Sequence, residues 1–119
     1  MAASSPASRG SADEFAGMLR ERILIEQAGT ERTAMGLQIA GWETVARCLA
    51  AIEPEGVGPE TEAQALSAMP RFRVSIRPRE GVAIDQRIRW GKRLLMIRQI
   101  VDDPRHRDRI TMRCEEVRA

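Results

Sequence analysis

Hydrophobic and charged residues alternate strictly in the centre of the chain, between residues 69 and 90. Side chains of a strand point to opposite faces in turn, so every second residue lies on the same side. The apolar positions of the first half are Phe72, Val74 and Ile76, and arginines occupy most positions between and after them. A helix would scatter these arginines around its circumference, so the period of two predicts a strand. Pro78 and Gly81 interrupt the pattern before it resumes, which predicts a β-hairpin with an apolar inner face and a guanidinium-rich outer face.

Other segments add further strands. Residues 19–28 alternate, with Leu19, Ile23 and Ile25 on the predicted inner face and Glu26 on the outer face. Residues 93–101 and 109–117 also have strand patterns, and Gly91-Lys92 predicts a tight turn before the first of them. The apolar positions of residues 42–53 satisfy both the helix and the strand period, and the pattern alone slightly favours the helix.

The remaining segments predict connections. Residues 29–41 are polar with three glycines and predict a long loop, with partial strand pairing as an alternative around residues 35–39. Residues 54–59 form a cluster of turn residues. Thr61 and Gln64 have the spacing of a capping box, so a short helix is expected before Pro70. The whole pattern predicts a mainly β fold: a small antiparallel β-barrel of about six strands, with a long loop that carries one short α-helix.

At 119 residues the chain has the length of one domain. Residues 1–16 are small and polar, so we expect a flexible N-terminal arm followed by a single barrel domain over residues 17–119. The N-terminus has no apolar core of a signal peptide, and no apolar run approaches a membrane span. We therefore expect no membrane association, and Cys48 and Cys114 to be free thiols.

Catalytic chemistry has little support in the sequence. The single histidine, His106, lies in a charged segment without nearby cysteines, so no metal site is predicted. No phosphate-binding glycine motif or nucleophile motif is present, so we expect neither a cofactor nor enzymatic activity.

The arginines of residues 71–89 and the acidic residues of 53–62 are the candidate functional residues. Three interpretations remain open: a solvated strand face, contact with phosphates of nucleic acid, or ion pairs with another subunit. A net charge of only +2 does not by itself indicate nucleic-acid binding, and an aromatic content of 3% argues against a surface that stacks on bases. The candidates for a subunit interface or a DNA channel are Arg71, Arg73, Arg77, Arg79, Arg87, Arg89, Glu53, Glu55, Glu60 and Glu62.

The order and spacing of several short motifs resemble the phage head-tail joining proteins, also called head-tail adaptor, head-closure or stopper proteins. These motifs are Leu19-x-x-x-Ile23-x-Ile25, Gly41-Trp42-x-x-Val45-Ala46, Ala51-x-x-Pro54, Phe72-x-Val74-x-Ile76-Arg77, Gly81-Val82, Ile88-x-Trp90-Gly91-Lys92-x-Leu94-x-Met96-Ile97 and Ile110-x-Met112-x-Cys114-Glu115-Glu116. Pro78 and Met96 stand where the family often has aromatic residues, a departure that would fit a divergent branch such as a gene transfer agent.

The resemblance implies a small β-barrel with a strand at residues 42–52, which decides the ambiguous segment. It also implies a homo-oligomeric ring, expected to be a hexamer, that is assembled in the bacterial cytoplasm and sits in the virion neck. Expected partners are portal or adaptor proteins on the head side, tail terminator or tail proteins on the other side, and packaged DNA in the channel. The alternative is a small-barrel nucleic-acid-binding module that uses the basic strands between Arg71 and Arg89.

Overall fold

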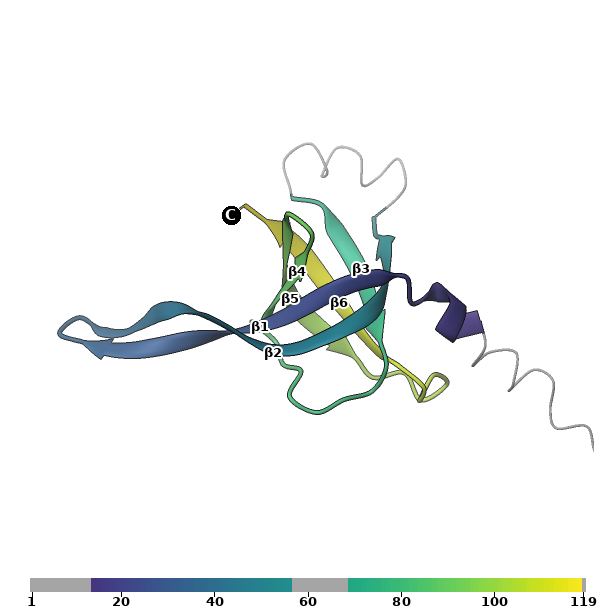
Figure 1. The fold of residues 1–119 in the computed structure, drawn as a ribbon, viewed down its shortest axis with the longest axis horizontal. Helices are drawn as coiled ribbons and strands as arrows, with labels where there is room; N and C mark the ends of the chain where they lie inside the picture. Colours follow the sequence, from purple (N-terminus) through teal and green to yellow (C-terminus); the bar gives the residue numbers. More distant parts are fainter. Residues whose placement is uncertain (1–13, 57–68, 119) are drawn as a thin grey trace, which may run out of the picture.

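A computed structural model of the protein describes residues 14–56 and 69–118, and in it six antiparallel strands close into a barrel (Figure 1). The order around the barrel is β1-β2-β3-β6-β5-β4, and β4 pairs back onto β1. The strands are β1 (Glu21–Thr33), β2 (Gly36–Pro54), β3 (Arg71–Ile76), β4 (Arg87–Trp90), β5 (Arg93–Val101) and β6 (Ile110–Val117). The mainly β fold expected from the sequence is thus confirmed.

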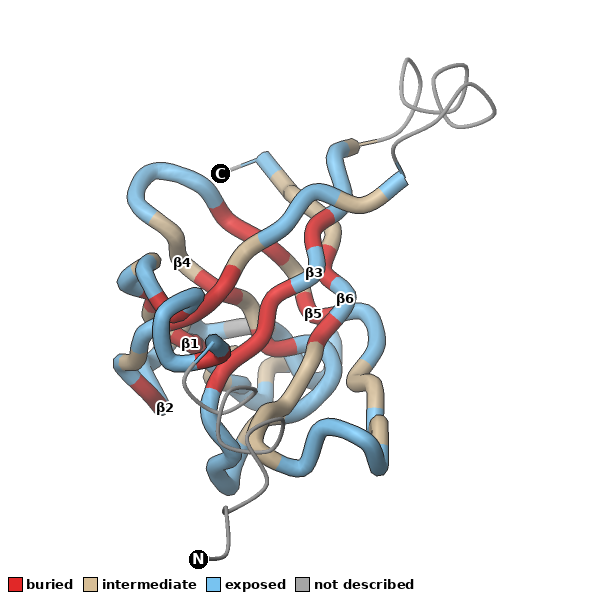
Figure 2. The backbone as a smooth tube through the Cα atoms, turned by 90° about the vertical axis from the view of Figure 1, so that its right-hand side faces the viewer, coloured by how far each residue is buried: buried red, intermediate tan, exposed pale blue. Residues whose placement is uncertain are grey.

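The core consists of the inward-facing residues of all six strands (Figure 2). Alternation produces this arrangement, because every second side chain of a strand enters the interior while its neighbours face water. The fully enclosed members with zero exposure are Ile25, Ala50, Val74, Ile76, Ile88, Leu95, Ile97 and Met112. The predicted inner face of residues 72–76 is confirmed, and the arginines between these residues are exposed.

One end of the barrel is closed by aromatic rings from opposite walls. The rings of Phe72 on β3 and Trp90 on β4 meet edge to face, with centroids 5.7 Å apart. The Arg93 guanidinium lies 4.8 Å from the Phe72 centroid and 5.0 Å from the Trp90 centroid, and it forms an ion pair with Glu116 at 2.7 Å. This stack covers the apolar interior where the strands end.

A short helix at residues 14–18 packs on the outside of the barrel. Phe15 is 2% exposed and packs with Leu19 and Ala51, and the Arg109 guanidinium lies 4.1 Å from its ring centroid. The last residues of the predicted flexible arm therefore belong to this helix. The rest of that arm, like the predicted helix after Thr61, lies outside the described residues.

The long loop predicted for residues 29–41 is wrong. β1 and β2 continue through this segment as a twisted two-stranded ribbon that ends in a turn at residues 34–35 and extends well beyond the barrel (Figure 1). The register shifts next to Gly29, and Gly41 has a φ of 122°, a conformation that favours glycine at such a bulge. The glycines that indicated a loop therefore serve a bulge and a tight turn inside a long hairpin.

The hairpin predicted for residues 69–90 is also wrong. β3 pairs with β2 and β6, whereas β4 pairs with β1 and β5. The two strands are three places apart in the closed ring of six, so they form opposite walls. Residues 77–86 are too long and irregular for a tight turn, and they cross the end of the barrel from one wall to the other.

The strand expected for residues 42–53 is confirmed as part of β2, with one change of face. A register shift between Ile25 and Glu26 leaves Val45 without its own partner, so the alternation reverses there. Ala46 and Ala50 enter the core, but Trp42 lies on the outer surface, against the Arg87 guanidinium. The remaining strands, β5 and β6, lie where the sequence predicts them.

Gln86 holds the connection between β3 and β4. Its side chain is 4% exposed, its Oε1 accepts a hydrogen bond from the Ala83 amide at 2.9 Å, and its Nε2 donates to the Gly81 carbonyl at 2.7 Å. The same Nε2 lies 3.4 Å from Oε1 of Gln27 on β1. These bonds replace the ladder hydrogen bonds that a regular hairpin would provide.

We expect Gln86→Ala to lower the free energy of unfolding by about 1–3 kcal/mol, because the backbone groups of Ala83 and Gly81 lose their partner and the buried site of the side chain is emptied. Gln99→Ala, at an exposed position of β5, is the matched control and should change it by less than about 0.5 kcal/mol. Urea unfolding followed by circular dichroism measures both. Equal effects of the two substitutions would show that Gln86 does not hold the connection.

Candidate assembly surfaces

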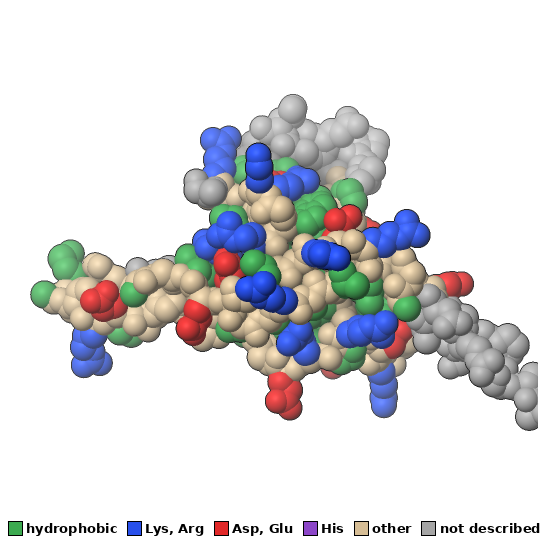
Figure 3. Space-filling view, viewed as in Figure 1, with side chains coloured by type: hydrophobic (Ala, Val, Ile, Leu, Met, Phe, Trp, Pro, Cys, Tyr) green, Lys and Arg blue, Asp and Glu red, His purple; other side chains and the backbone are tan. Residues whose placement is uncertain are grey.

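The predicted arginine series is divided between opposite sides of the barrel. Arg71 and Arg73 project from β3, and Arg87 and Arg89 project from β4, the opposite wall. The fold therefore does not join these arginines into one continuous basic surface, which the nucleic-acid-binding alternative requires. Basic side chains (blue) are instead spread over the surface among acidic ones (red) in Figure 3.

The first group, which we name the β3 arginine face, comprises Arg71, Arg73, Arg98, Arg113, Glu55 and Glu115. Glu55 lies 3.1 Å from Arg73 and 3.5 Å from Arg113, whereas Glu115 lies 4.0 Å from Arg71 and 3.5 Å from Arg98. Four guanidinium groups thus share two carboxylates, which leaves an excess of positive charge. Most of these residues line a shallow hollow of about 330 Å³.

The guanidinium groups of the β3 arginine face remain accessible, with side-chain exposures of 49% to 64%. Exposed ion pairs contribute about 0–1 kcal/mol each, so they add little to the stability of the barrel. The same groups can therefore exchange partners at low cost and pair with carboxylates of another chain. This makes the face a candidate for binding an acidic surface.

The acidic candidates have different positions. Glu55 pairs within its own chain, although the sequence pointed to a neighbouring subunit as partner, and Glu53 is exposed opposite Arg73 in the strand register. Glu60 and Glu62 lie outside the described residues. The sequence analysis missed Arg98, Arg113 and Glu115, because only the pairing of β6 with β3 and β5 brings them to this face.

The second group, which we name the Glu26 cluster, comprises Glu26, Trp42, Arg87 and Arg89. The Arg87 Nε donates to Glu26 Oε1 at 2.6 Å, and the Arg89 Nε donates to Oε2 at 3.4 Å. The Arg87 guanidinium also lies 4.2 Å from the Trp42 ring centroid. Glu26 lies on the outer face as predicted, but these neighbours cover it, so it is only 7% exposed.

Burial opposes ionisation of Glu26, but the hydrogen bond and charge of Arg87, with a further contribution from Arg89, hold its pKa below the usual range. The carboxylate is therefore ionised at neutral pH and joins β1, β2 and β4 where the barrel closes. Such a partly buried, hydrogen-bonded group contributes more than an exposed pair. The Glu26 cluster thus has a structural role, and Arg87 and Arg89 are less available to a partner than Arg71 and Arg73.

Arg77 and Arg79 lie on the connection that follows β3, and both are exposed. No ion pair joins either of them to another residue in the described part of the chain. Arg79 lies beside Cys48, where it opposes the effect of burial, which raises the pKa of that thiol. Cys114 lies in the core, and burial raises its pKa to about 12.

Over residues 14–56 and 69–118, no three histidine, cysteine or acidic side chains gather in a way that could hold a metal ion. In the same ranges, no helix has the length and apolar character needed to cross a bilayer.

A family model for phage head completion proteins matches residues 16–117, which include all six strands. The chain belongs to the phage head completion protein family. Members of this family are structural proteins, and the protein is accordingly a virion component that acts where the head joins the tail. The family resemblance inferred from the sequence motifs is confirmed.

Two solved structures have a similar fold. The solution structure of protein SF1141 from Shigella flexneri 2a is 27% identical, with a TM-score of 0.60 over 84% of this chain and 94% of that chain. A chain of the virion of a native gene transfer agent particle is 18% identical, with a TM-score of 0.60 over 85% of this chain and 97% of that chain. Comparison of the sequence with curated proteins gives no match.

We expect Glu26→Gln to lower the free energy of unfolding by about 2 kcal/mol at pH 7, because two guanidinium groups lose a charged partner. The folded-state pKa of Glu26 is depressed, so its contribution is present above the unfolded-state pKa of about 4.3 and is lost as the pH falls through the folded-state value. The difference between wild type and variant should therefore shrink in acid. Urea unfolding at several pH values measures it.

Glu43→Gln is the matched control, because Glu43 is exposed on the same hairpin and forms no ion pair with any described residue. It should change the free energy of unfolding by less than about 0.5 kcal/mol at every pH. A Glu26→Gln effect that does not depend on pH would contradict the electrostatic role of Glu26.

Proposed function

We propose that the protein is a ring-forming connector, of the stopper or head-closure type, in the neck of a tailed phage or gene transfer agent. It joins the portal-adaptor complex to the tail, and DNA passes through the hole of the ring. The observation that carries this proposal is the family match over the whole barrel. The similar fold of a chain in a gene transfer agent virion supports a place in such a particle.

Two different surfaces on opposite walls support the ring. β3 presents exposed guanidinium groups, whereas on β4 the Arg87 side chain is only 16% exposed because it packs against Glu26 and Trp42. Contacts between unlike faces of identical chains are heterologous, and they generate a closed ring when the rotation between neighbours divides a full turn. A barrel with unlike opposite walls is suited to this type of contact.

Arg71, Arg73, Arg77 and Arg79 are the residues that we assign to the contact with a neighbouring subunit or with DNA. All four are exposed, and Arg77 and Arg79 have no carboxylate partner within the described residues. Glu53 is exposed on the neighbouring strand and is available to a basic partner. Partners on the head side are portal or adaptor proteins, and those on the other side are tail terminator or tail proteins.

The double variant Arg73→Glu/Arg77→Glu tests the proposal. We expect the purified chain to remain folded, because both side chains are exposed. The yield of joined particles should fall about tenfold or more, since a loss of about 1.4 kcal/mol of contact energy changes an equilibrium tenfold. Electron microscopy counts heads with and without tails, and thermal unfolding checks the fold. Arg107→Glu/Arg118→Glu carries the same charge change at two other exposed positions and serves as the control.

If the Arg73→Glu/Arg77→Glu chain is folded and the particles join normally, these arginines have no role in assembly. If particles made without the protein join their tails normally, the connector function itself is wrong. Salt-dependent binding of the isolated wild-type chain to DNA would instead favour the nucleic-acid-binding alternative.

A further inference from the structure

The end of the β1–β2 hairpin carries the most exposed large hydrophobic residues of the described chain. Met35 is 86% exposed and Leu37 is 69% exposed, more than any other large apolar side chain whose exposure the structure describes. We name residues 27–43 the arm. In this segment β1 and β2 pair only with each other, because β1 pairs with β4 only up to Glu26 and β2 pairs with β3 only from Ala51 onward. Figure 3 shows the hydrophobic side chains (green) at the far end of this arm, away from the barrel.

The arm has no third strand along its length, and an isolated two-stranded hairpin is marginally stable in water. Its base is nevertheless fixed to the barrel. Arg87 stacks on Trp42, and the Gln86 side chain bonds Gln27 at 3.4 Å. The arm is therefore aimed away from its own barrel, and no residue within 14–56 and 69–118 covers its apolar end.

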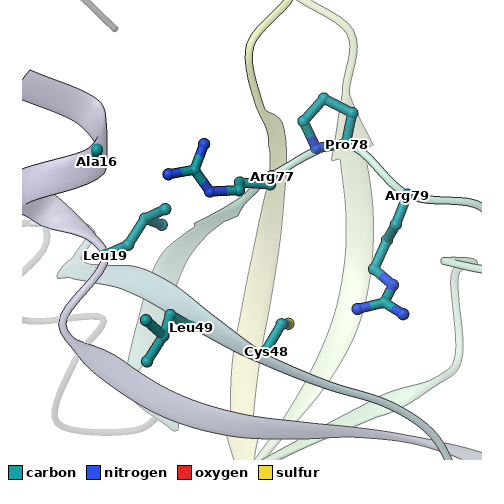
Figure 4. A pocket seen from close by; sticks show the side chains of 7 residues that line it. All are labelled: Ala16, Leu19, Cys48, Leu49, Arg77, Pro78 and Arg79. Carbon is teal, nitrogen blue, oxygen red and sulfur yellow. The ribbon is translucent and has the colours of Figure 1, made fainter. Parts of the chain in front are cut away.

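The barrel offers a matching groove. A hollow of about 270 Å³ lies between the helix at residues 14–18, β2 and the connection after β3 (Figure 4). Its apolar walls are Leu19, Cys48, Leu49 and Pro78, and Arg77 and Arg79 flank it. Apolar cavities of roughly 150 Å³ already admit a benzene-sized group, so this groove can receive the side chain of a methionine or leucine.

The arm and the groove cannot meet within one chain, because they lie on opposite sides of the barrel along its long axis (Figure 1). We propose that the arm of one copy inserts Met35 and Leu37 into this groove on a second copy. The contact joins unlike surfaces, so each copy gives one arm and receives one, which is the head-to-tail geometry of a ring. This inference rests on the proposed ring and names the contact that would close it.

The charges at the two surfaces permit a second copy as the occupant. Glu31 and Arg32 are both exposed near the end of the arm, and neither has an ion-pair partner in the described residues. Arg77 and Arg79 lie at the rim of the groove and also form no ion pair in these residues. Glu31 lies on the face of the arm opposite to Leu37 and Arg32, so insertion of Leu37 leaves the Glu31 carboxylate available to the guanidinium groups at the rim.

A disulfide cross-link tests the contact directly, because such a bond forms only when the two Cα atoms come within about 7 Å. Met35→Cys places a thiol at the end of the arm, and the native Cys48 lines the groove. Particles carrying Met35→Cys are purified and oxidised with copper phenanthroline. We expect the protein to run as a ladder of disulfide-linked multimers on a non-reducing gel.

Three matched chains define the result. Met35→Cys/Cys48→Ala should give no ladder, and Ile84→Cys, at an exposed position outside the arm and the groove, should give none either. Wild type should also give none, because it has no thiol on the arm to react with Cys48, and Cys114 is buried. A disulfide-linked dimer that persists without Cys48 would mean that two arms touch each other, and it would overturn the proposal.

The readouts separate this contact from the proposed function. If the Met35→Cys chain is present in joined particles but forms no Cys48-dependent ladder, the arm contact is wrong and the connector function stands. If the wild-type chain is missing from purified particles, the connector function fails and the contact fails with it. As a second test, Met35→Ser/Leu37→Ser should reduce the yield of joined particles about tenfold or more, whereas Ile84→Ser should leave it unchanged.

Discussion

The pairing of β4 with β1 is the constraint on which the rest of the structure depends. Three residue pairs form this seam: Leu24 with Arg89, Ile25 with Ile88, and Glu26 with Arg87. Ile25 and Ile88 are fully buried on its inner side, and the Glu26 carboxylate joins both arginines on its outer side. Because the seam is short, apolar packing and the buried ion pair together hold what would otherwise be two exposed strand edges.

Closure of the sheet fixes where the functional surfaces lie. It places β3 and β4 on opposite walls, so arginines that are neighbours in the sequence serve different surfaces. It also anchors the base of the arm, because Trp42 packs on Arg87 of the same seam. In the proposed ring, the arm on one side is the donor surface of each copy and the groove on the other side is its acceptor surface. A connector that repeats around an axis needs this asymmetry.

Alternation was sufficient to predict β3, β6 and the first part of β1, because each buries one face. β5 was predicted instead from its apolar run, and its neighbouring residues Leu94 and Leu95 are both buried. Alternation failed for the arm, because its strands bury neither face. It also failed to identify the partner of β3, because no residue pattern in the sequence shows which distant strand another strand pairs with. The bulge at Val45 reversed the face of Trp42 in the same way. The exposed arginines of β3 could be predicted from the sequence, but Arg98, Arg113 and Glu115 depend on register.

A cryo-electron microscopy reconstruction of the particle neck tests the central claim most directly. The account predicts a closed ring of these barrels between portal and tail, with the β1–β2 hairpin of each copy lying on the barrel of the next and the β3 wall facing a neighbour or the DNA. A neck without this barrel, or a single copy whose hairpin projects into solvent, would contradict it.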